Sequence, residues 1–266
     1  MQTKKRPFYK KLLFWELGIL IMVVAALVIC LGFQGITNPI LAENPYEPED
    51  FTEANGYMTE VSGESVLGID VSQWQGDIDW QQVKSAGVEF ALLRIGGRGT
   101  GQEGKLYIDD NAQKNYAGAS SAGIKVGGYF FSQAISEEEA VEEARYLLEL
   151  TEGWDFQMPI VFDWEYMDDA RTSDITAQGI MAFAKAFCDE IAEAGHTPMV
   201  YFNYRMLSNG FDLEQMADYH FWLAHYDSEM DFPYRVDMWQ YTASGSVPGI
   251  SGNVDMNLYF PRKEGK

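Results

Sequence analysis

Two carboxylic acids stand two residues apart near the end of a mostly apolar stretch, PIVFDWEY, at residues 159–166. The first half of this stretch has the continuous hydrophobic character of a strand that is buried on both faces. Because side chains alternate along a strand, Val161, Asp163 and Glu165 share one face. Paired carboxylates are the usual means of cleaving a glycosidic bond, one as proton donor and the other supporting positive charge at the anomeric carbon.

Two further acids end other predicted strands, Asp70 in GIDVSQW and Asp255 in GNVDMNLYF. In a closed barrel the first and last strands are neighbours, so Asp70 would lie beside Asp255 and four carboxylates would line one cleft. Like-charge neighbours and burial beside Trp164 would raise the pKa of one acid and leave it protonated near neutral pH. The spacing of about 6.6 Å between alternate Cα atoms of a strand fits both retaining and inverting geometries, so the stereochemistry stays open.

An irregular (β/α) barrel of about eight strands, similar to a TIM barrel, is the fold that would position these acids. From residue 66 onward, short apolar runs alternate with helical segments, which implies parallel pairing and right-handed crossovers. The runs are VLGIDVS, VEFALLRIG, IKVGGYFFS, PIVFDWE, TPMVYFN, HFWLAHY, VDMWQYT and VDMNLYF. In such barrels the reactive groups gather at the carboxyl ends of the strands. The segments that join the last three runs are short and poor in helix signals, so we expect the barrel to be degenerate there.

Capping residues mark the four helices that follow the first four strands. Asp79 can cap WQQVKSAG, and Asp109 or Asp110 can open NAQKNYAGASSAG. Ser136 and Glu139 have the spacing of a capping box before AVEEARYLLEL. The fourth helix, ITAQGIMAFAKAFCDEIAEAG, ends at Gly195.

Clustered acids can also bind a metal, because hard cations take oxygen ligands. No loop in the sequence has the dense alternation of Asp and Asn that is typical of a calcium site, and His196, His220 and His225 lack metal-ligand spacing. The glycine-rich GGRGTG lacks the Lys-Ser/Thr ending of a phosphate loop. We therefore expect neither a metal site nor a phosphate-binding loop.

Aromatic residues crowd the same strand ends, and their faces suit the C–H faces of sugar rings. They are Trp74, Tyr129, Phe131, Tyr166, Tyr201, Phe202, Tyr226, Trp239 and Tyr241. We expect about half of them to belong to the core. The substrate-binding candidates are Tyr129, Tyr201, Trp239, Gln240 and Trp74.

The N-terminus has the character of a membrane anchor. Five bases, Lys4, Lys5, Arg6, Lys10 and Lys11, precede an apolar run from Leu12 to Phe33 that is interrupted only by Glu16 near its start. Roughly 20 apolar residues span a bilayer, and preceding positive charge keeps the N-terminus in the cytoplasm. We expect residues 1–36 to form a cytoplasmic tail and a single-pass anchor in the cell membrane, with the catalytic domain outside. A signal peptide that is cleaved near Ala42, giving a secreted protein, is the alternative.

Residues 37–65 are rich in acids and contain Pro39, Pro45 and Pro48, so we expect an acidic linker before a barrel at 66–266. Acids outnumber bases 40 to 19 and the net charge is -21, which argues against a nucleic-acid partner. Cys30 lies in the predicted span and Cys188 in a predicted helix, so a disulfide between them is implausible. We expect a monomeric catalytic domain.

Four segments resemble, in order and spacing, the glycoside hydrolase family 25 lysozymes, the N-acetylmuramidases of bacterial and phage origin. They are GIDVSQWQGDIDWQQVKSAGVEFALLRIG, IKVGGYFFS, PIVFDWE and MWQYTASGSVPGISGNVDMNLYF, within residues 66–260. The resemblance implies an irregular (β/α) barrel that hydrolyses the β-1,4 bond between N-acetylmuramic acid and N-acetylglucosamine in peptidoglycan. It implies no cofactor, because positioned carboxylates and the substrate's own amide suffice for this catalysis.

By position, the resemblance makes Glu165 the general acid. It makes Asp163 its partner, which either stabilises an oxazolinium formed by the substrate's own acetamido group or acts more directly. Asp70 and Asp255 match two further acids that line the family's cleft. Tyr129 matches the Tyr of a Tyr-His-Phe-like segment, but a Phe follows it where His is common, which leaves the role of this strand's outer end open.

Two other functions stay open. A chitinase-like glycosidase is one, because DWEY also ends the chitinase signature, although Val161 stands where that signature needs a further acid. A non-catalytic peptidoglycan-binding barrel is the other, although all four acids are present.

Overall fold

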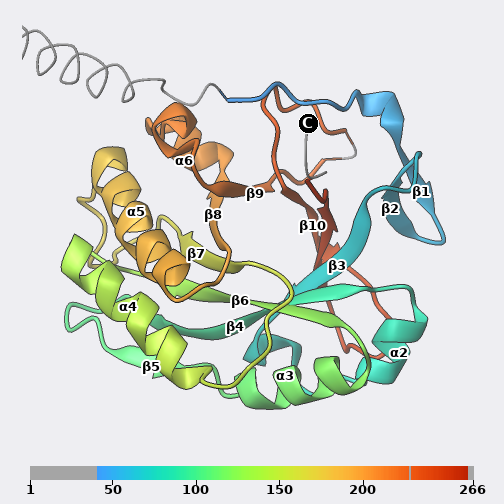
Figure 1. Ribbon diagram of the computed structural model, residues 1–266, viewed down its shortest axis with the longest axis horizontal. Helices are drawn as coiled ribbons and strands as arrows, with labels where there is room; N and C mark the ends of the chain where they lie inside the picture. The colour runs from blue at the N-terminus through green and yellow to red at the C-terminus, as the bar shows by residue number, and fades with distance from the viewer. Residues whose placement is uncertain (1–40, 228, 263–266) are drawn as a thin grey trace, which may run out of the picture. The chain divides into compact units, whose positions relative to one another are not determined.

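The computed structural model describes residues 41–227 and 229–262, in which eight strands close into a barrel (Figure 1). The strands are β3 (Val66–Val71), β4 (Phe90–Arg98), β6 (Lys125–Ser132), β7 (Ile160–Trp164), β8 (Pro198–Asn203), β9 (His220–Ala224), β10 (Met238–Gly245) and β11 (Val254–Tyr259). They pair in the order β3-β11-β10-β9-β8-β7-β6-β4, and the pairing of β4 with β3 closes the ring. The predicted irregular barrel is therefore confirmed.

The last strand runs against the others. The other seven barrel strands are joined to one another by parallel pairings, whereas β11 is antiparallel to both of its neighbours, β10 and β3. Asp255 was expected at a strand end but is the second residue of β11. Because β11 is reversed, its beginning lies at the same rim as the ends of the parallel strands, and Asp255 is the direct register partner of Asp70.

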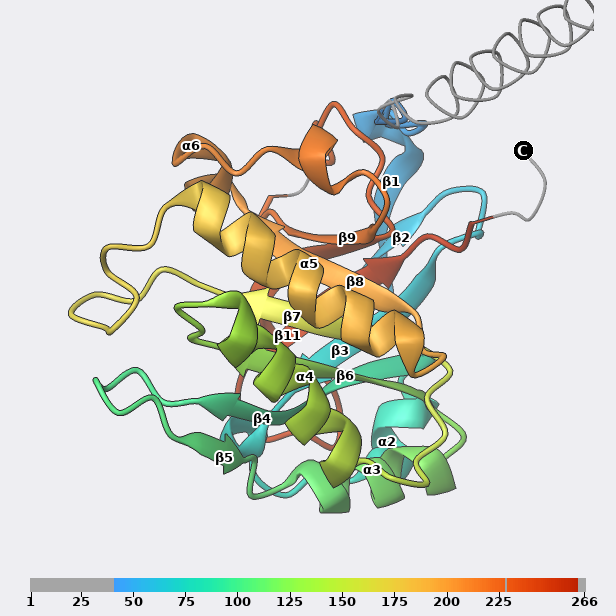
Figure 2. The ribbon, with the colours of Figure 1, turned by 60° about the vertical axis from the view of Figure 1, so that its left-hand side comes forward.

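Helices follow the first four barrel strands, as predicted. They are α2 (Trp80–Ser85), α3 (Ala112–Ser121), α4 (Glu137–Leu150) and α5 (Ala177–Glu193). In Figure 2, α4 and α5 lie side by side across the outside of the barrel. The later connections hold only α6 (Tyr204–Ser208) and η3 (Leu213–Met216), and the short strand β5 (Leu106–Ile108) pairs with the end of β4. The last third of the barrel is thus degenerate in helices, as expected.

The first two helix starts follow local capping chemistry. Asp79 is the N-cap of α2, and its carboxylate accepts a hydrogen bond from the Gln82 amide at 3.1 Å. The N-cap of α3 is Asn111, so the expectation of Asp109 or Asp110 was wrong by one or two residues. The Asp109 carboxylate accepts a hydrogen bond from the Asn111 amide at 3.0 Å and stabilises this turn from outside the helix.

Helix α4 begins with only half of the predicted capping box. The Ser136 hydroxyl accepts a hydrogen bond from the Glu139 amide at 3.3 Å. The Glu139 carboxylate, however, accepts from the Ile135 amide and pairs with Arg171. An ion pair with a distant loop has therefore replaced the local return hydrogen bond.

Two apolar layers follow from the alternation of side chains along the strands. The interior layer contains Phe90, Leu92, Met158, Val161, Met199, Tyr201, Trp222, Ala224 and Met238. The opposite side chains of β7, Ile160, Phe162 and Trp164, belong to the outer layer against the helices. Gly68 makes room for the Phe90 ring, which a Cβ at this position would overlap. Apolar side chains therefore fill the barrel interior below its rim.

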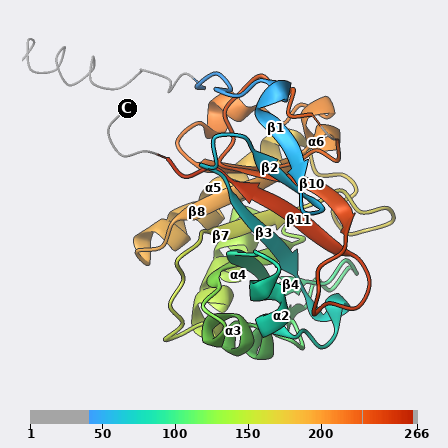
Figure 3. The ribbon, with the colours of Figure 1, turned by 90° about the vertical axis from the view of Figure 1, so that its right-hand side faces the viewer.

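The expected acidic linker is largely folded in its described part. Residues 41–65 contain η1 (Pro48–Asp50) and a hairpin of β1 (Phe51–Ala54) and β2 (Tyr57–Glu60). Figure 3 shows this hairpin beside β10, on a side of the barrel without a long helix. Phe51 is only 8% exposed, and its ring packs edge-on against Trp239 with centroids 5.2 Å apart. Apolar side chains within this acidic stretch thus help to dock it on the barrel, because they cover an otherwise bare strand.

The predicted membrane span, residues 12–33, and Cys30 lie outside the described residues. Within residues 41–227 and 229–262, we find no helix that is both long enough and apolar enough to cross a membrane. Cys188 is buried in α5 as a free thiol.

Candidate active site

A cavity of about 200 Å³ opens at the rim where the parallel strands end, and it contains all four predicted acids. Its lining residues are Asp70, Arg94, Tyr129, Phe131, Asp163, Glu165, Tyr201, Trp222, Tyr226, Gln240 and Asp255. They come from all eight barrel strands, except Glu165 and Tyr226, which lie one and two residues beyond the ends of β7 and β9. Closure of the barrel is what brings the sequence-distant acids together.

Asp163 and Glu165 rise from β7 on the inward face, above Val161 in the interior layer. Asp163 is the fourth residue of the strand and is buried. Its Oδ1 atom is buried and has no hydrogen-bond partner among the described residues. Glu165 is the first residue after the strand and is half-buried. The pair therefore places one carboxyl group deep in the cavity and the other nearer its opening.

Burial raises the pKa of Asp163 well above its usual range, the charges of Glu165 and Asp70 raise it further, and Arg94 opposes them. Burial also raises the pKa of Glu165, with a contribution from the charge of Asp255. Two buried carboxyl groups that disfavour each other's charge cannot both ionise readily. We expect the pair to keep a proton near neutral pH, which a general acid requires.

Asp70 and Asp255 form the second pair of acids. Asp70 Oδ2 accepts hydrogen bonds from Gln240 Nε2 and Asn257 Nδ2, both at 2.8 Å. Burial and then the charge of Asp255 raise the pKa of Asp70 well above its usual range. Burial also raises the pKa of Asp255, whereas a hydrogen bond with Asp70 lowers it. This pattern indicates a proton on Asp70 that is donated to a charged Asp255.

Aromatic side chains wall the cavity on the side of β6, β8 and β9. The rings of Tyr129 and Tyr201 pack edge-on against Trp222, with centroids 6.2 Å and 5.1 Å away. Trp222 Nε1 donates to Asn257 Oδ1 at 2.8 Å, which fixes the amide that in turn donates to Asp70. Tyr226 is 58% exposed and donates to Oε1 of the buried Gln240 at 2.9 Å. This hydrogen bond links the exposed edge of the cavity to its buried part.

Three of the five predicted substrate-binding residues, Tyr129, Tyr201 and Gln240, line the cavity. Trp239 does not: it is fully buried in the outer layer, and its Nε1 donates to the carbonyl of His225 at 2.7 Å. Trp239 and Gln240 are neighbours on β10 and must point to opposite faces, which excludes Trp239 as a cavity contact. Trp74, in η2 (Gln73–Gln75), lies outside the lining but is 76% exposed, so its contact with a longer ligand stays a prediction.

The other aromatic residues at the strand ends divide between the lining and the packing around it. Phe131 and Tyr226 line the cavity. Phe202 and Tyr241 are buried in the outer layer, and Tyr166 packs edge-on against Trp164. The expected division between core and cleft is therefore close to what the structure contains.

Arg94 is a cavity residue that the sequence reading missed. Its Nε donates to Asp109 Oδ2 at 2.7 Å, and the Gln73 amide donates to the same oxygen at 3.0 Å. The available signal was a single cation inside the buried run ALLRIG. A buried cation needs a buried partner, and Arg94 brings positive charge to the side of the cavity that holds Asp163.

Among the residues that the structure describes, no three His, Cys, Asp or Glu side chains converge in a way that could hold a metal ion. The cavity lining offers carboxyl groups, phenols, the Gln240 amide and the Arg94 guanidinium. A carboxyl group that keeps a proton, beside a second carboxyl group with a free oxygen, can protonate a leaving group and support developing positive charge.

Comparison with known proteins gives a consistent assignment. Residues 69–250 match the family described as Glycosyl hydrolases family 25. Lysozyme M1 of Streptomyces globisporus is 31% identical over 206 residues, which cover 73% of this chain and 67% of the relative. The autolytic lysozyme of Clostridium acetobutylicum is 27% identical over 193 residues, which cover 72% of this chain but only 55% of the relative.

Solved structures agree. The bacterial lysozyme from Streptomyces coelicolor has 31% sequence identity and a TM-score of 0.62, over 73% of this chain and 91% of that one. The family match spans more than half of the chain and includes Asp70, Asp163 and Glu165. The chain belongs to glycosyl hydrolases family 25.

Proposed function

We propose that this protein is a muramidase that hydrolyses the β-1,4 bond between N-acetylmuramic acid and N-acetylglucosamine in peptidoglycan. The observation that carries the proposal is the convergence of Asp70, Asp163, Glu165 and Asp255 in one cavity of a family 25 barrel. The relatives named lysozyme in Streptomyces and Clostridium support the same substrate class.

Glu165 is the proposed general acid. It lies nearer the opening than Asp163, so a glycosidic oxygen can reach it, and its raised pKa favours a transferable proton. Asp163 is the proposed partner. Its unpaired Oδ1 can accept a hydrogen bond from the acetamido N–H of the substrate. Burial and the charges of Glu165 and Asp70 raise its pKa, and Arg94 partly opposes them.

Asp70 and Asp255 hold the other side of the sugar ring. The charge that they share makes the cavity negative, which favours the positive charge that develops at the anomeric carbon. Tyr129, Tyr201 and Tyr226 offer ring faces and hydroxyl groups to the glycan. Trp74, which is exposed and outside the cavity lining, is the proposed contact for a longer glycan.

A Glu165→Gln variant and product analysis test the proposal together. Mass spectrometry of reduced digestion products should find muramic acid at the new reducing ends. Glucosamine at those ends would contradict the muramidase assignment, and a wild-type protein that binds but does not cleave the wall would favour a non-catalytic barrel. Wall-lytic activity that survives in Glu165→Gln would show that another group is the acid.

We also propose that the N-terminal apolar run keeps the enzyme at the cell membrane, on the evidence of the bases before it and its length. Full-length protein should then fractionate with membranes. Recovery from the medium of a mature form that starts near Glu43 would instead support cleavage of a signal peptide.

A further inference from the structure

The backbone of Glu165 lies just beyond the sheet that carries it. Strand β7 ends at Trp164, whose register partner on β6 is Ser132, and on the other side β7 pairs with β8 only from Ile160 to Phe162. No ladder pairing therefore includes Glu165. A side chain that must aim a proton to within a fraction of an ångström needs another support.

That support is the side chain of Gln133, which follows β6 and is completely buried. Its Nε2 donates to the carbonyl of Glu165 at 3.2 Å and to the carbonyl of Ser132 at 2.9 Å. Its Oε1 accepts a hydrogen bond from the Thr172 hydroxyl at 2.9 Å. Because both carbonyls can only accept, the amide has one satisfied orientation, and Gln133 ties Glu165 to the strand next to it.

Thr172 is itself fixed by the residue before it. The Arg171 guanidinium makes a bidentate pair with Glu139, with both N–O distances at 2.8 Å, and donates to the carbonyl of Gln133 at 3.3 Å. Arg171 is buried at its side chain, 6% exposed, so water competes little for these contacts. The loop between β7 and α5 is thus pinned to the start of α4.

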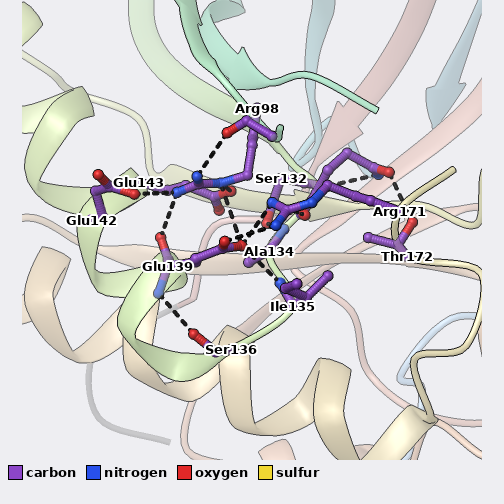
Figure 4. Close-up of polar contacts among 12 residues, drawn as sticks. Arg98, Ser132, Ala134, Ile135, Ser136, Glu139, Glu142, Glu143, Arg171 and Thr172 are labelled. Carbon is purple, nitrogen blue, oxygen red and sulfur yellow. Dashed lines mark hydrogen bonds and ion pairs between the residues drawn. The ribbon is translucent and has the colours of Figure 1, made fainter. Parts of the chain in front are cut away.

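A second buried arginine, Arg98, contacts the same turn of α4 as Arg171, as Figure 4 shows. Arg98, at the end of β4, donates to Glu143 Oε1 at 2.7 Å and to Glu142 Oε2 at 2.6 Å, and its Nε lies 3.8 Å from Glu139 Oε2. Two arginines and three glutamates therefore join β4, α4 and the loop after β7 into one unit. A neutral, apolar contact could not set the orientation of the loop as narrowly.

We propose that Gln133, Thr172 and Arg171 are positioning residues that hold Glu165 in its proton-donating orientation over the cavity. None of the three lines the cavity, so they act through the backbone of Glu165 and not on the glycan. The inference rests on the proposed function, because that function makes Glu165 the acid.

The experiment compares two bidentate Arg–Glu ion pairs, each of which has one partner on α4. Arg171→Lys breaks the pair with Glu139, whereas Arg145→Lys breaks the pair of Arg145 with Glu190, which joins α4 to α5 on the exposed surface. Gln133→Met removes the hydrogen bonds to the carbonyls of Glu165 and Ser132 at similar side-chain length. Thr172→Val is a less disruptive variant that can be used if Gln133→Met does not fold. It removes only the hydroxyl that orients the Gln133 amide.

For Gln133→Met and Arg171→Lys we expect kcat to fall about 10- to 100-fold with KM changed less than about 3-fold, since about 1 Å of misplacement can cost that much. Arg145→Lys should match the wild type. A structural weakening alone would lower the melting temperature and leave kcat of the folded protein unchanged.

The second readout needs no turnover. The carboxyl carbon of Glu165, assigned by its loss in Glu165→Gln, can be titrated by NMR in each folded variant. A side chain released toward water should titrate at lower pH than in the wild type, because burial is what raises its pKa. Unchanged titration in Gln133→Met, Thr172→Val and Arg171→Lys, or an equal shift in Arg145→Lys, would overturn the inference. A wild type without muramidase activity would refute the proposed function, while the titration would still decide the positioning role.

Discussion

The first part of the barrel and its last third build the same rim by different means. Strands β3, β4, β6 and β7 are parallel and each is followed by a helix that covers its outer face. Strands β10 and β11 are antiparallel, and the N-terminal hairpin covers β10. The regular part supplies Asp70, Asp163 and Glu165, and the irregular part supplies Asp255 and Gln240. The cleft requires that its acids lie at the same rim of the barrel. An antiparallel strand can place an acid there as well as a parallel strand can.

The largest expected effect is on kcat, and it differs between Asp163 of the regular part and Asp255 of the irregular part. Asp163→Asn should lower kcat by about 10² to 10⁴, the range for loss of a group that acts on the transition state. Asp255→Asn should cost roughly tenfold in kcat, because Asp70 can lose its proton more readily once the charge of Asp255 is gone, which restores negative charge to the cavity. Initial rates on purified peptidoglycan measure both. Equal losses would mean that the reversed strand contributes to the chemistry as fully as β7.

A smaller effect on activity, but a large one on stability, is expected for the hairpin. Phe51→Ala removes a buried ring from Trp239 and should lower the free energy of unfolding by about 3 kcal/mol. Denaturant unfolding measures the loss, and kcat of the folded fraction should stay near that of the wild type. Exposed Val61→Ala is the control in the same segment. A Phe51→Ala protein as stable as the wild type would show that the hairpin is not needed to cover β10.

Two tryptophans from the two parts give the next contrast. Trp74→Ala should raise KM for long glycan chains several-fold, since stacking on an exposed ring is worth about 1 kcal/mol, and should leave the melting temperature unchanged. Trp239→Phe should do the reverse, because its side chain is fully buried away from the cavity. Steady-state kinetics with long and short glycans, together with thermal unfolding, distinguish them. A KM effect from Trp239→Phe would contradict the placement of its ring.

The smallest effect concerns pH. The pKa of Asp163 is raised in the folded protein, so between its ordinary range and that raised value the folded state binds more protons than the unfolded state. The free energy of unfolding therefore falls as pH rises through this window. Asp163→Asn removes this fall in the free energy of unfolding. The melting temperature should therefore rise at pH 7, by about 2–4 °C for each kcal/mol of stability regained, and should hardly change at pH 4. Calorimetry at both pH values tests this, and an Asn variant less stable at pH 7 would contradict it.

The sequence predicted the regular part of the fold in detail because its signals are local. Hydrophobic runs, the Asp79 cap and the alternation along β7 each depend on a few adjacent residues. The direction of β11 could not be read in this way, because a six-residue apolar run has the same composition in either direction. The hairpin at 51–60 was not predicted, because the high content of acids in residues 37–65 indicated a linker. Its packing depends on two aromatic residues of that segment, Phe51 and Tyr46.

The acids of the site could be found because a charged side chain at the end of a buried strand is conspicuous. Arg94 carries the same signal within its strand and could have been found by it. Trp239 was assigned wrongly although alternation with Gln240 already excluded it. Gln133 could not have been recognised, because a glutamine after a strand has no distinguishing pattern until its partners, Thr172 and the Glu165 carbonyl, are known.

The position of β11 has a consequence for how the protein comes into being. This strand is the last of the barrel in sequence and fits between β10 and β3, the first. A polypeptide that emerges N-terminus first therefore presents Asp163 and Glu165 nearly a hundred residues before Asp255 can arrive beside Asp70. Long-range closure of this kind is a late event in folding. On the proposed function, a newly made chain could not cleave the wall until β11 has joined the barrel.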